Sequence, residues 1–275
     1  MPDLVYDKHS QGNYAVFTMN RPDRLNAQGS IMAQELEAAL HDFTNDPAMR
    51  AGILTGAGRA FSAGADLREM AERNDTLVLL ESQLKHGEIT IEEYGQRLLA
   101  YQRGGSQPFS GNPKPFIAAV NGLAIGAGME RATDCDIRIA STNAYFGLFE
   151  VKRGIMAGYG IHNMARVMPF GEAMYLMLTG DTMTSEDARR IGFVHEVVAP
   201  ERLMSRAIEV AVMIAENAPL AVQGTKAVAQ FWRQFGREES LRMGAWVSRH
   251  VMSSEDAREG PRAFAEKRPP VWKGG

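Results

Sequence analysis

The sequence contains almost no cysteine: Cys135 is the single one among 275 residues. An intrachain disulfide is therefore excluded, and with it the class of small secreted scaffolds that depend on several such bonds. One cysteine and six scattered histidines also provide no good metal-ligand cluster, so we expect no metal site. A chain of this length can bury a sizeable hydrophobic core, so it needs neither a disulfide nor a bound metal to fold.

Long apolar runs and an excess of one charge are absent as well. Charged residues or glycines interrupt each apolar stretch before about 18 residues, so we expect no membrane-spanning helix. The first residues lack the basic and apolar segments of a secretory signal, and we expect a cytoplasmic protein. A net charge of −3 argues against a nucleic-acid partner, because domains that bind through bulk charge are usually basic.

Several enzyme signatures are missing or incomplete. There is no Gly-x-x-x-x-Gly-Lys phosphate loop and no His-Glu-x-x-His zinc helix. The run around Ser62 lacks the first glycine of a serine nucleophile elbow. The pair Gly126 and Gly128 lacks the third glycine of a dinucleotide motif, because Arg131 stands there. These gaps disfavour the corresponding functions.

Strands and helices alternate along the first two thirds of the chain. Residues 4–19 read as a β-hairpin, and the glycine-rich residues 56–66 read as a loop before a helix. Further segments follow from apolar spacing and turn residues: helices at 30–45 and 91–102, strands at 51–55, 116–120 and 136–140, and a polar loop at 104–113.

The last part of the chain is mostly helical in pattern. Its expected elements are helices at 171–178, 185–191, 200–217, 219–235, 237–252 and 254–266, with one strand at 193–198. The amphipathic tail from Pro219 has few partners within one compact unit, so we expect it to dock on the core or on another subunit.

Two glycine-rich strand-to-helix turns stand out, at residues 63–66 and 126–128. Each presents free backbone N–H groups at a helix start, where the helix dipole favours negative charge. Two such groups that converge on one oxygen would form an oxyanion hole. For either turn alone, a purely structural role is the better interpretation; two turns with acids nearby favour a functional one.

The acids are Glu130, in the first turn of the second helix, and Glu150, which lies among apolar neighbours. Desolvation would raise the pKa of Glu150 and suit it to acid–base work. The alternatives are solvated surface glutamates and, for Arg131 and Asp136, a structural ion-pair network. Spacing alone does not choose between them.

Four motifs follow one another along the chain: residues 20–27 (NRPDRLNA), 60–67 (AFSAGADL), 115–122 (PFIAAVNG) and 126–130 (GAGME). Residues 134–140, 178–181, 188–194 and 255–268 continue the match over nearly the whole chain. Together they resemble the enoyl-CoA hydratase/isomerase (crotonase) superfamily. The resemblance implies an α/β fold in which ββα units form a spiral over residues 1–200. It also implies a C-terminal helical region, residues 201–275, that builds a homotrimer or a dimer of trimers.

The same resemblance implies an acyl-CoA thioester as substrate, with coenzyme A as part of that substrate and no separate cofactor. The backbone N–H groups of Ala65 and Ala127 would hold the thioester oxygen. Glu130 would activate a water for attack at Cβ, and Glu150 would give a proton to Cα. The implied reaction is hydration of a trans-2-enoyl-CoA.

Further residues match family positions that contact coenzyme A: Arg24, Leu25, Ala63, Asp66, Leu67 and Arg68, with Phe264 and Lys267 completing the site near the C-terminus. The resemblance allows Phe264 to reach the site from a neighbouring subunit. Gly158 lies in the loop after Glu150 that would shape the water and acyl pocket.

The sequence also departs from the family pattern. Arg131 follows Glu130 where a small or apolar residue is usual, and Ala157 replaces a frequent proline. Other reactions therefore stay open: dehydration of a specialised acyl-CoA, isomerisation, thioester hydrolysis, or a catalytically silent homologue that only binds CoA esters. A second acid at Glu130 favours water chemistry over isomerisation.

Overall fold

Two β-sheets form the body of the protein in a computed structural model that describes residues 1–102 and 108–274. The large sheet contains, in spatial order, β1 (Leu4–His9), β2 (Tyr14–Met19), β3 (Ala51–Gly56), β5 (Phe116–Val120), β7 (Ile137–Ser141) and β10 (Glu196–Val198). The small sheet contains β4 (Ala60–Ser62), β6 (Leu123–Ile125), β8 (Tyr145–Gly147) and β9 (Thr182–Thr184).

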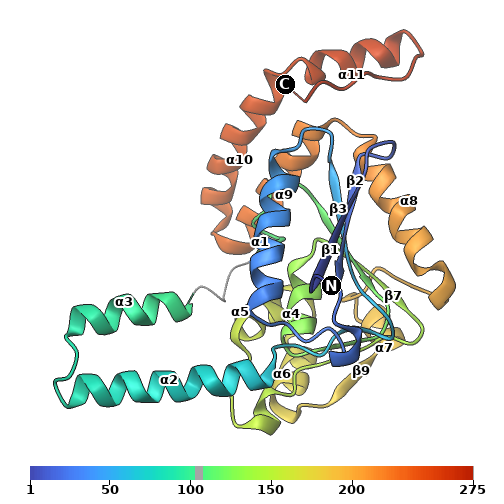
Figure 1. The fold of residues 1–275 in the computed structure, drawn as a ribbon. Helices are drawn as coiled ribbons and strands as arrows, with labels where there is room; N and C mark the ends of the chain where they lie inside the picture. The colour runs from blue at the N-terminus through green and yellow to red at the C-terminus, as the bar shows by residue number, and fades with distance from the viewer. Residues whose placement is uncertain (103–107, 275) are drawn as a thin grey trace.

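The expected hairpin is confirmed, because β1 and β2 pair antiparallel. The other pairs of the large sheet are parallel. Side chains alternate between its faces: Phe17 joins the core under α1 (Ser30–Asn45), and Val16 joins the core under α8 (Leu203–Ala215). Figure 1 shows α1 and α8 on opposite sides of this sheet.

Three successive units repeat one plan. In each, the first strand joins the large sheet, the second joins the small sheet, and a helix follows. The helices are α2 (Leu67–Lys85), α4 (Ala127–Asp134) and, after a 3₁₀ turn at Glu150–Arg153, α5 (Gly158–Val167). The repeat confirms the expected α/β architecture of ββα units.

Two helical extensions leave the body (Figure 1). The arm consists of α2 and α3 (Ile91–Gln102), and Thr90 and Glu93 cap α3 reciprocally. The second extension consists of α10 (Arg237–Met252) and α11 (Asp256–Ala265), reached through α9 (Pro219–Gln234). The remaining helices are α6 (Phe170–Thr179) and α7 (Ser185–Arg190). The helical tail predicted from the sequence is therefore present.

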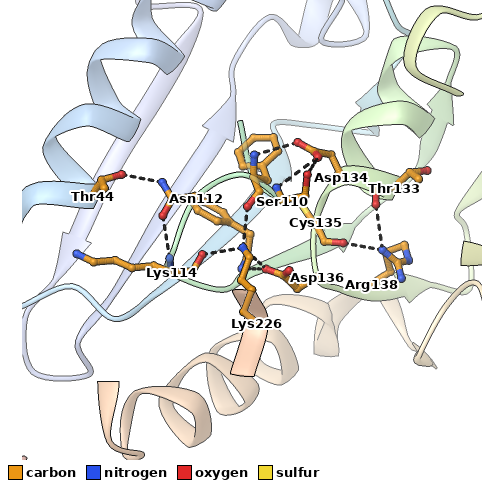
Figure 2. Close-up of polar contacts among 12 residues, drawn as sticks. Thr44, Ser110, Asn112, Lys114, Thr133, Asp134, Cys135, Asp136, Arg138 and Lys226 are labelled. Atoms are coloured by element: carbon orange, nitrogen blue, oxygen red, sulfur yellow. Dashed lines mark hydrogen bonds and ion pairs between the residues drawn. The ribbon is translucent and has the colours of Figure 1, made fainter. Parts of the chain in front are cut away.

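Lys226 connects α9 to the body of the protein through three hydrogen bonds. Its Nζ donates to the carbonyl oxygens of Phe109 (2.7 Å) and Lys114 (3.0 Å) and to Asp136 Oδ2 (2.7 Å). Figure 2 shows this lysine and Asp136 at the centre of a polar cluster. Asp136 thus belongs to a structural ion pair, which was one of the two interpretations that its sequence context allowed.

Some expectations were wrong in detail. The loop expected at 56–66 contains strand β4. Of the strand expected at 193–198, only Glu196–Val198 forms a strand, β10. The loop expected after Glu150 ends earlier, because α5 begins at Gly158. Part of the polar loop at 104–113 lies outside the described residues. No helix in the described part of the chain has both the length and the apolar content needed to cross a bilayer.

Candidate active site

The candidate residues gather where β4, β6 and β8 end. These strands are parallel neighbours, β4 with β6 and β6 with β8, so their carboxyl ends share one edge of the small sheet. The turn with Ala65 follows β4, the turn with Ala127 follows β6, and Glu150 follows β8. Three consecutive units of the chain thus bring the predicted oxyanion donors and one acid to one place.

The two glycine turns touch each other. Gly64 has φ +95°, and a Cβ at this position would lie 2.8 Å from the carbonyl oxygen of Ile125 and 3.2 Å from the nitrogen of Ala127. Only a glycine permits both this backbone conformation and this approach. The contact holds the start of α4 beside the turn that carries Ala65.

The N–H groups of Ala65 and Ala127 are both left over by the local pairing. The backbone of Gln28 pairs with the turn at residues 64–66. Its N–H donates to the Gly64 carbonyl (2.7 Å) and its carbonyl accepts from the Asp66 N–H (2.9 Å), which leaves the Ala65 N–H without a partner in this pairing. Ala127 begins α4, so its N–H has no partner within the helix. Within residues 1–102 and 108–274 neither group has a hydrogen-bond acceptor. Two adjacent free donors are what an oxyanion hole requires.

Substituting Gly64 with alanine should therefore separate the two donors. We expect Gly64→Ala to lower kcat by about 10²-fold, the typical cost of losing one oxyanion donor. Gly87→Ala is the matched control, because Gly87 also has positive φ (+70°) but a Cβ at that position would meet nothing within 4 Å. Steady-state kinetics with melting curves check this; equal activity losses in both variants would contradict the assigned contact.

Glu130 is held by the first turn of α5. Its Oε1 accepts a hydrogen bond from the Gly160 N–H at 2.6 Å. Burial raises the pKa of Glu130, while the N–H groups of Gly160 and Tyr159 and the nearby charge of Arg131 oppose that rise. The carboxylate is thus desolvated yet provided with groups that favour its ionised form.

Glu150 has fewer groups near it that favour its ionised form. Its Oε2 is buried and has no hydrogen-bond partner among the described residues. Burial raises the pKa of Glu150, and the charge of Glu130 raises it further, against only the N–H of its own backbone. The charge of Glu130 therefore acts on Glu150, and burial disfavours the ionised form of both carboxyl groups.

The side chain of Arg131 contacts Gln28 and Phe109. Its Nε donates to Gln28 Oε1 at 3.1 Å, and its guanidinium centre lies 5.9 Å from the ring centroid of Phe109. This placement answers a question that the sequence alone leaves open, namely whether this arginine reaches the acids. It contributes to the pKa of Glu130 through its charge and makes no ion pair with it.

Several predicted coenzyme A contacts lie around the same turn. Leu25 has a left-handed backbone (φ +51°), and its carbonyl accepts from the N–H of Ala63 at 2.9 Å. The Nη1 of Arg24 lies 3.7 Å from Oδ2 of Asp66. Leu67 and Arg68 begin α2 and are both exposed.

Asp66 itself is buried and fully engaged. Its carboxylate caps α2 through the Arg68 N–H (3.1 Å) and pairs with Arg21 (3.0 Å). Burial alone would raise the pKa of Asp66, but the hydrogen bonds from Arg21 and from the Arg68 backbone hold it below its ordinary value. Its role in this structure is to fix the loop that presents Arg24.

Two predicted contacts are not brought to this place within one chain. Phe264, 87% exposed, lies on α11, and Lys267 follows that helix. Figure 1 shows α11 at the opposite end of the molecule from the start of α2. Gly158 needs a correction: it is the exposed first residue of α5 and not a loop residue. Sequence reasoning missed Gln28, Tyr159 and Gly160, whose contacts with the site no local pattern indicates.

Comparison with known proteins gives one family. The model of the family described as enoyl-CoA hydratase/isomerase matches residues 9–275. The chain is 38% identical to the short-chain-enoyl-CoA hydratase of Clostridium acetobutylicum over 94% of this chain and 93% of that protein. It is also 38% identical to the carnitinyl-CoA dehydratase of Salmonella arizonae over 94% of both. The crystal structure of an enoyl-CoA hydratase from Mycobacterium tuberculosis superposes with a TM-score of 0.85 at 31% identity, over the full length of both chains.

Proposed function

Because the chain belongs to the enoyl-CoA hydratase/isomerase family, we propose that it adds water across the double bond of a trans-2-enoyl-CoA thioester and catalyses the reverse dehydration. Relatives whose names denote a hydratase and a dehydratase both support chemistry of this kind. The observation that carries the proposal is the placement of two carboxyl groups, Glu130 held by Gly160 and Glu150 with its unpartnered Oε2, at the turns that carry two free backbone donors.

In the proposed reaction, ionised Glu130 accepts a proton from water as the water oxygen bonds to C3 of the enoyl group. The electron pair of the double bond moves towards the thioester oxygen, which accepts hydrogen bonds from the N–H groups of Ala65 and Ala127. Protonated Glu150 then gives its proton to C2. Atoms and charge balance, since one carboxyl gains the proton that the other loses, and solvent exchange restores both.

In this proposal, coenzyme A binds to the arginines beside the turn that carries Ala65. Arg24 and Arg68 are exposed there and would attract its phosphates. The proposed reaction needs no metal or redox group, because the acids and the backbone donors provide the proton transfers and the charge stabilisation. A cytoplasmic location is part of the same proposal.

The identity of the product tests the proposed function. When the chain is incubated with a trans-2-enoyl-CoA in H₂¹⁸O, we expect an intact acyl-CoA that carries ¹⁸O at C3. Label in a free carboxylic acid together with free coenzyme A would indicate thioester hydrolysis. A shifted double bond without label would indicate isomerisation, and either outcome would contradict the proposal.

We also propose that the chain acts as a homotrimer or a dimer of trimers. Large apolar side chains are exposed on the C-terminal helices, among them Trp232 (71%), Trp246 (73%) and Phe264 (87%). Such exposure is typical of interaction surfaces. A neighbouring copy would also bring Phe264 and Lys267 to the coenzyme A site. Sedimentation velocity should give the mass of three or six chains, and a monomer at micromolar concentration would contradict this.

A further inference from the structure

Arg131 is the cation nearest in sequence to the two acids, and the proposed hydration assigns it no role. Within the described residues, one of its five N–H donors is used, from Nε to Gln28 Oε1. No ion pair of its guanidinium is found in residues 1–102 and 108–274, although the charges of Asp134 and Glu130 act on it from farther away. Arg131 is half-buried, and removing a charge from water is costly unless it is paired, so this arginine is a candidate to bind an anion.

Arg138 shows what a purely structural buried arginine looks like in the same protein. Its Nε donates to the Phe193 carbonyl at 2.6 Å, and its Nη1 donates to the Cys135 carbonyl at 2.7 Å, with further contacts to Ala132 and Thr133. Figure 2 shows this arginine directed at the end of α4. Backbone oxygens thus use the donors of Arg138 in a way they do not use those of Arg131.

The location of Arg131 ties it to the proposed oxyanion hole from two sides. It lies four residues after Ala127 in α4, hence on the same helix face, and helical side chains lean towards the helix start. Its partner Gln28 forms the backbone bridge to Ala65. Arg131 therefore lies one helical turn along α4 from Ala127, one of the two proposed donors to the thioester oxygen.

A small cavity opens beside this guanidinium. It has a volume of about 20 Å³, and Gln28, Phe109, Met32 and Leu54 line it together with Arg131. A space of this size holds about one oxygen-sized group. Apart from Gln28 and Arg131 these side chains are apolar, so Arg131 is the cation that an anion entering the cavity would meet.

We propose that Arg131 is a specificity-determining residue that binds a carboxylate on the acyl group of the substrate. The substrate class is then a short trans-2-enoyl-CoA with a second, distal carboxylate, one oxygen of which enters the cavity. This inference rests on the proposed function, because it takes the site beside Ala65 and Ala127 as the thioester site. A single buried water that satisfies a structural Arg131 is the competing explanation.

The test compares two substrates of nearly equal shape, 4-carboxybut-2-enoyl-CoA and the neutral 5-methylhex-2-enoyl-CoA. We expect the wild-type chain to favour the carboxylate by at least about tenfold in kcat/KM. Arg131→Met, which keeps length without charge, should lower this ratio about 10²-fold, as expected when a hydrogen-bonded charge pair removed from water loses one member. Arg131→Lys should lie between them, because it keeps the charge without the planar fork.

Three outcomes would overturn the inference: a wild-type chain without preference for the carboxylate, turnover of the neutral substrate alone, or an equal fall for both substrates in Arg131→Met. If Arg131→Met does not fold, as judged by its melting curve, the wild-type ratio and Arg131→Lys decide. If the wild type hydrates neither substrate, the proposed function fails. Calorimetric binding of the saturated glutaryl-CoA and 5-methylhexanoyl-CoA then decides the role of Arg131 separately.

Discussion

Glu150→Gln is expected to lower kcat for hydration by about 10²–10⁴-fold, the usual contribution of one general acid. The same substitution should raise the melting temperature at neutral pH, because burial and the charge of Glu130 disfavour the ionised form of Glu150 in the folded protein, whereas a neutral amide has no such cost. Loss of activity with gain of stability is the signature of a strained functional group, since a merely structural glutamate would lose both.

The gain in stability should depend on pH with a definite sign. The pKa of Glu150 is raised by burial and by Glu130 above its ordinary value of 4.5. The folded state therefore binds this proton more tightly than the unfolded state does. Its contribution to stability is complete below the unfolded pKa and is lost as pH rises through the folded pKa. Melting curves of the variant and the wild type should thus converge near pH 4 and separate at pH 7.

Glu37→Gln is the matched control for Glu150→Gln. Glu37 lies exposed in the middle of α1, far from the site in the chain, and the same chemical change there should alter neither kcat nor the melting temperature. Full hydration activity in Glu150→Gln would remove this residue from the proposed mechanism.

Glu130→Gln is the second substitution with a large expected effect, and it should separate the roles of the two acids. Hydration should fall by about 10²–10⁴-fold, because the amide cannot accept a proton from water. Exchange of the C2 protons of a saturated acyl-CoA in D₂O should persist, since the ionised form of Glu150 can take a proton from C2 and return a deuteron while the oxyanion donors stabilise the enolate. Glu150→Gln should lose both activities.

Proton NMR of butyryl-CoA in D₂O measures the exchange, and loss of enone absorbance measures hydration. Gly160 still donates to the amide oxygen of a glutamine at position 130, so the fold around α5 should be kept. If Glu130→Gln lost C2 exchange as completely as Glu150→Gln, the assignment of Glu150 as the sole proton donor to C2 would be wrong.

Much of the fold could be predicted from the chain because its longer strands and helices carry clear apolar patterns. Strands β2, β3 and β5 are runs of five or six residues that are almost entirely buried, and such runs are recognisable without a partner. Strands β4, β6, β8 and β9 have three residues each, too few to show a period. Their place follows only from pairing with each other.

The candidate site likewise has a part that could be predicted from the sequence and a part that could not. Glu130, Glu150 and the glycine turns could be found from residue type, neighbours and the family resemblance. The contacts that set their chemistry join distant parts of the chain: Arg131 meets Gln28 across 103 positions, and Glu130 meets Gly160 across 30. Nothing local in the sequence indicates such pairs, and so the orientation of Arg131 could not be predicted.

Loss of enone absorbance from a trans-2-enoyl-CoA tests the central claim most directly, with the wild-type chain and the double variant Glu130→Gln/Glu150→Gln assayed side by side. The proposed mechanism predicts rapid turnover by the wild type. It also predicts a double variant that is little worse than either single variant, because residues that act as a unit are not additive. Intact binding of the acyl-CoA without turnover by the wild type would contradict the account and would leave a protein that binds CoA esters without hydrating them.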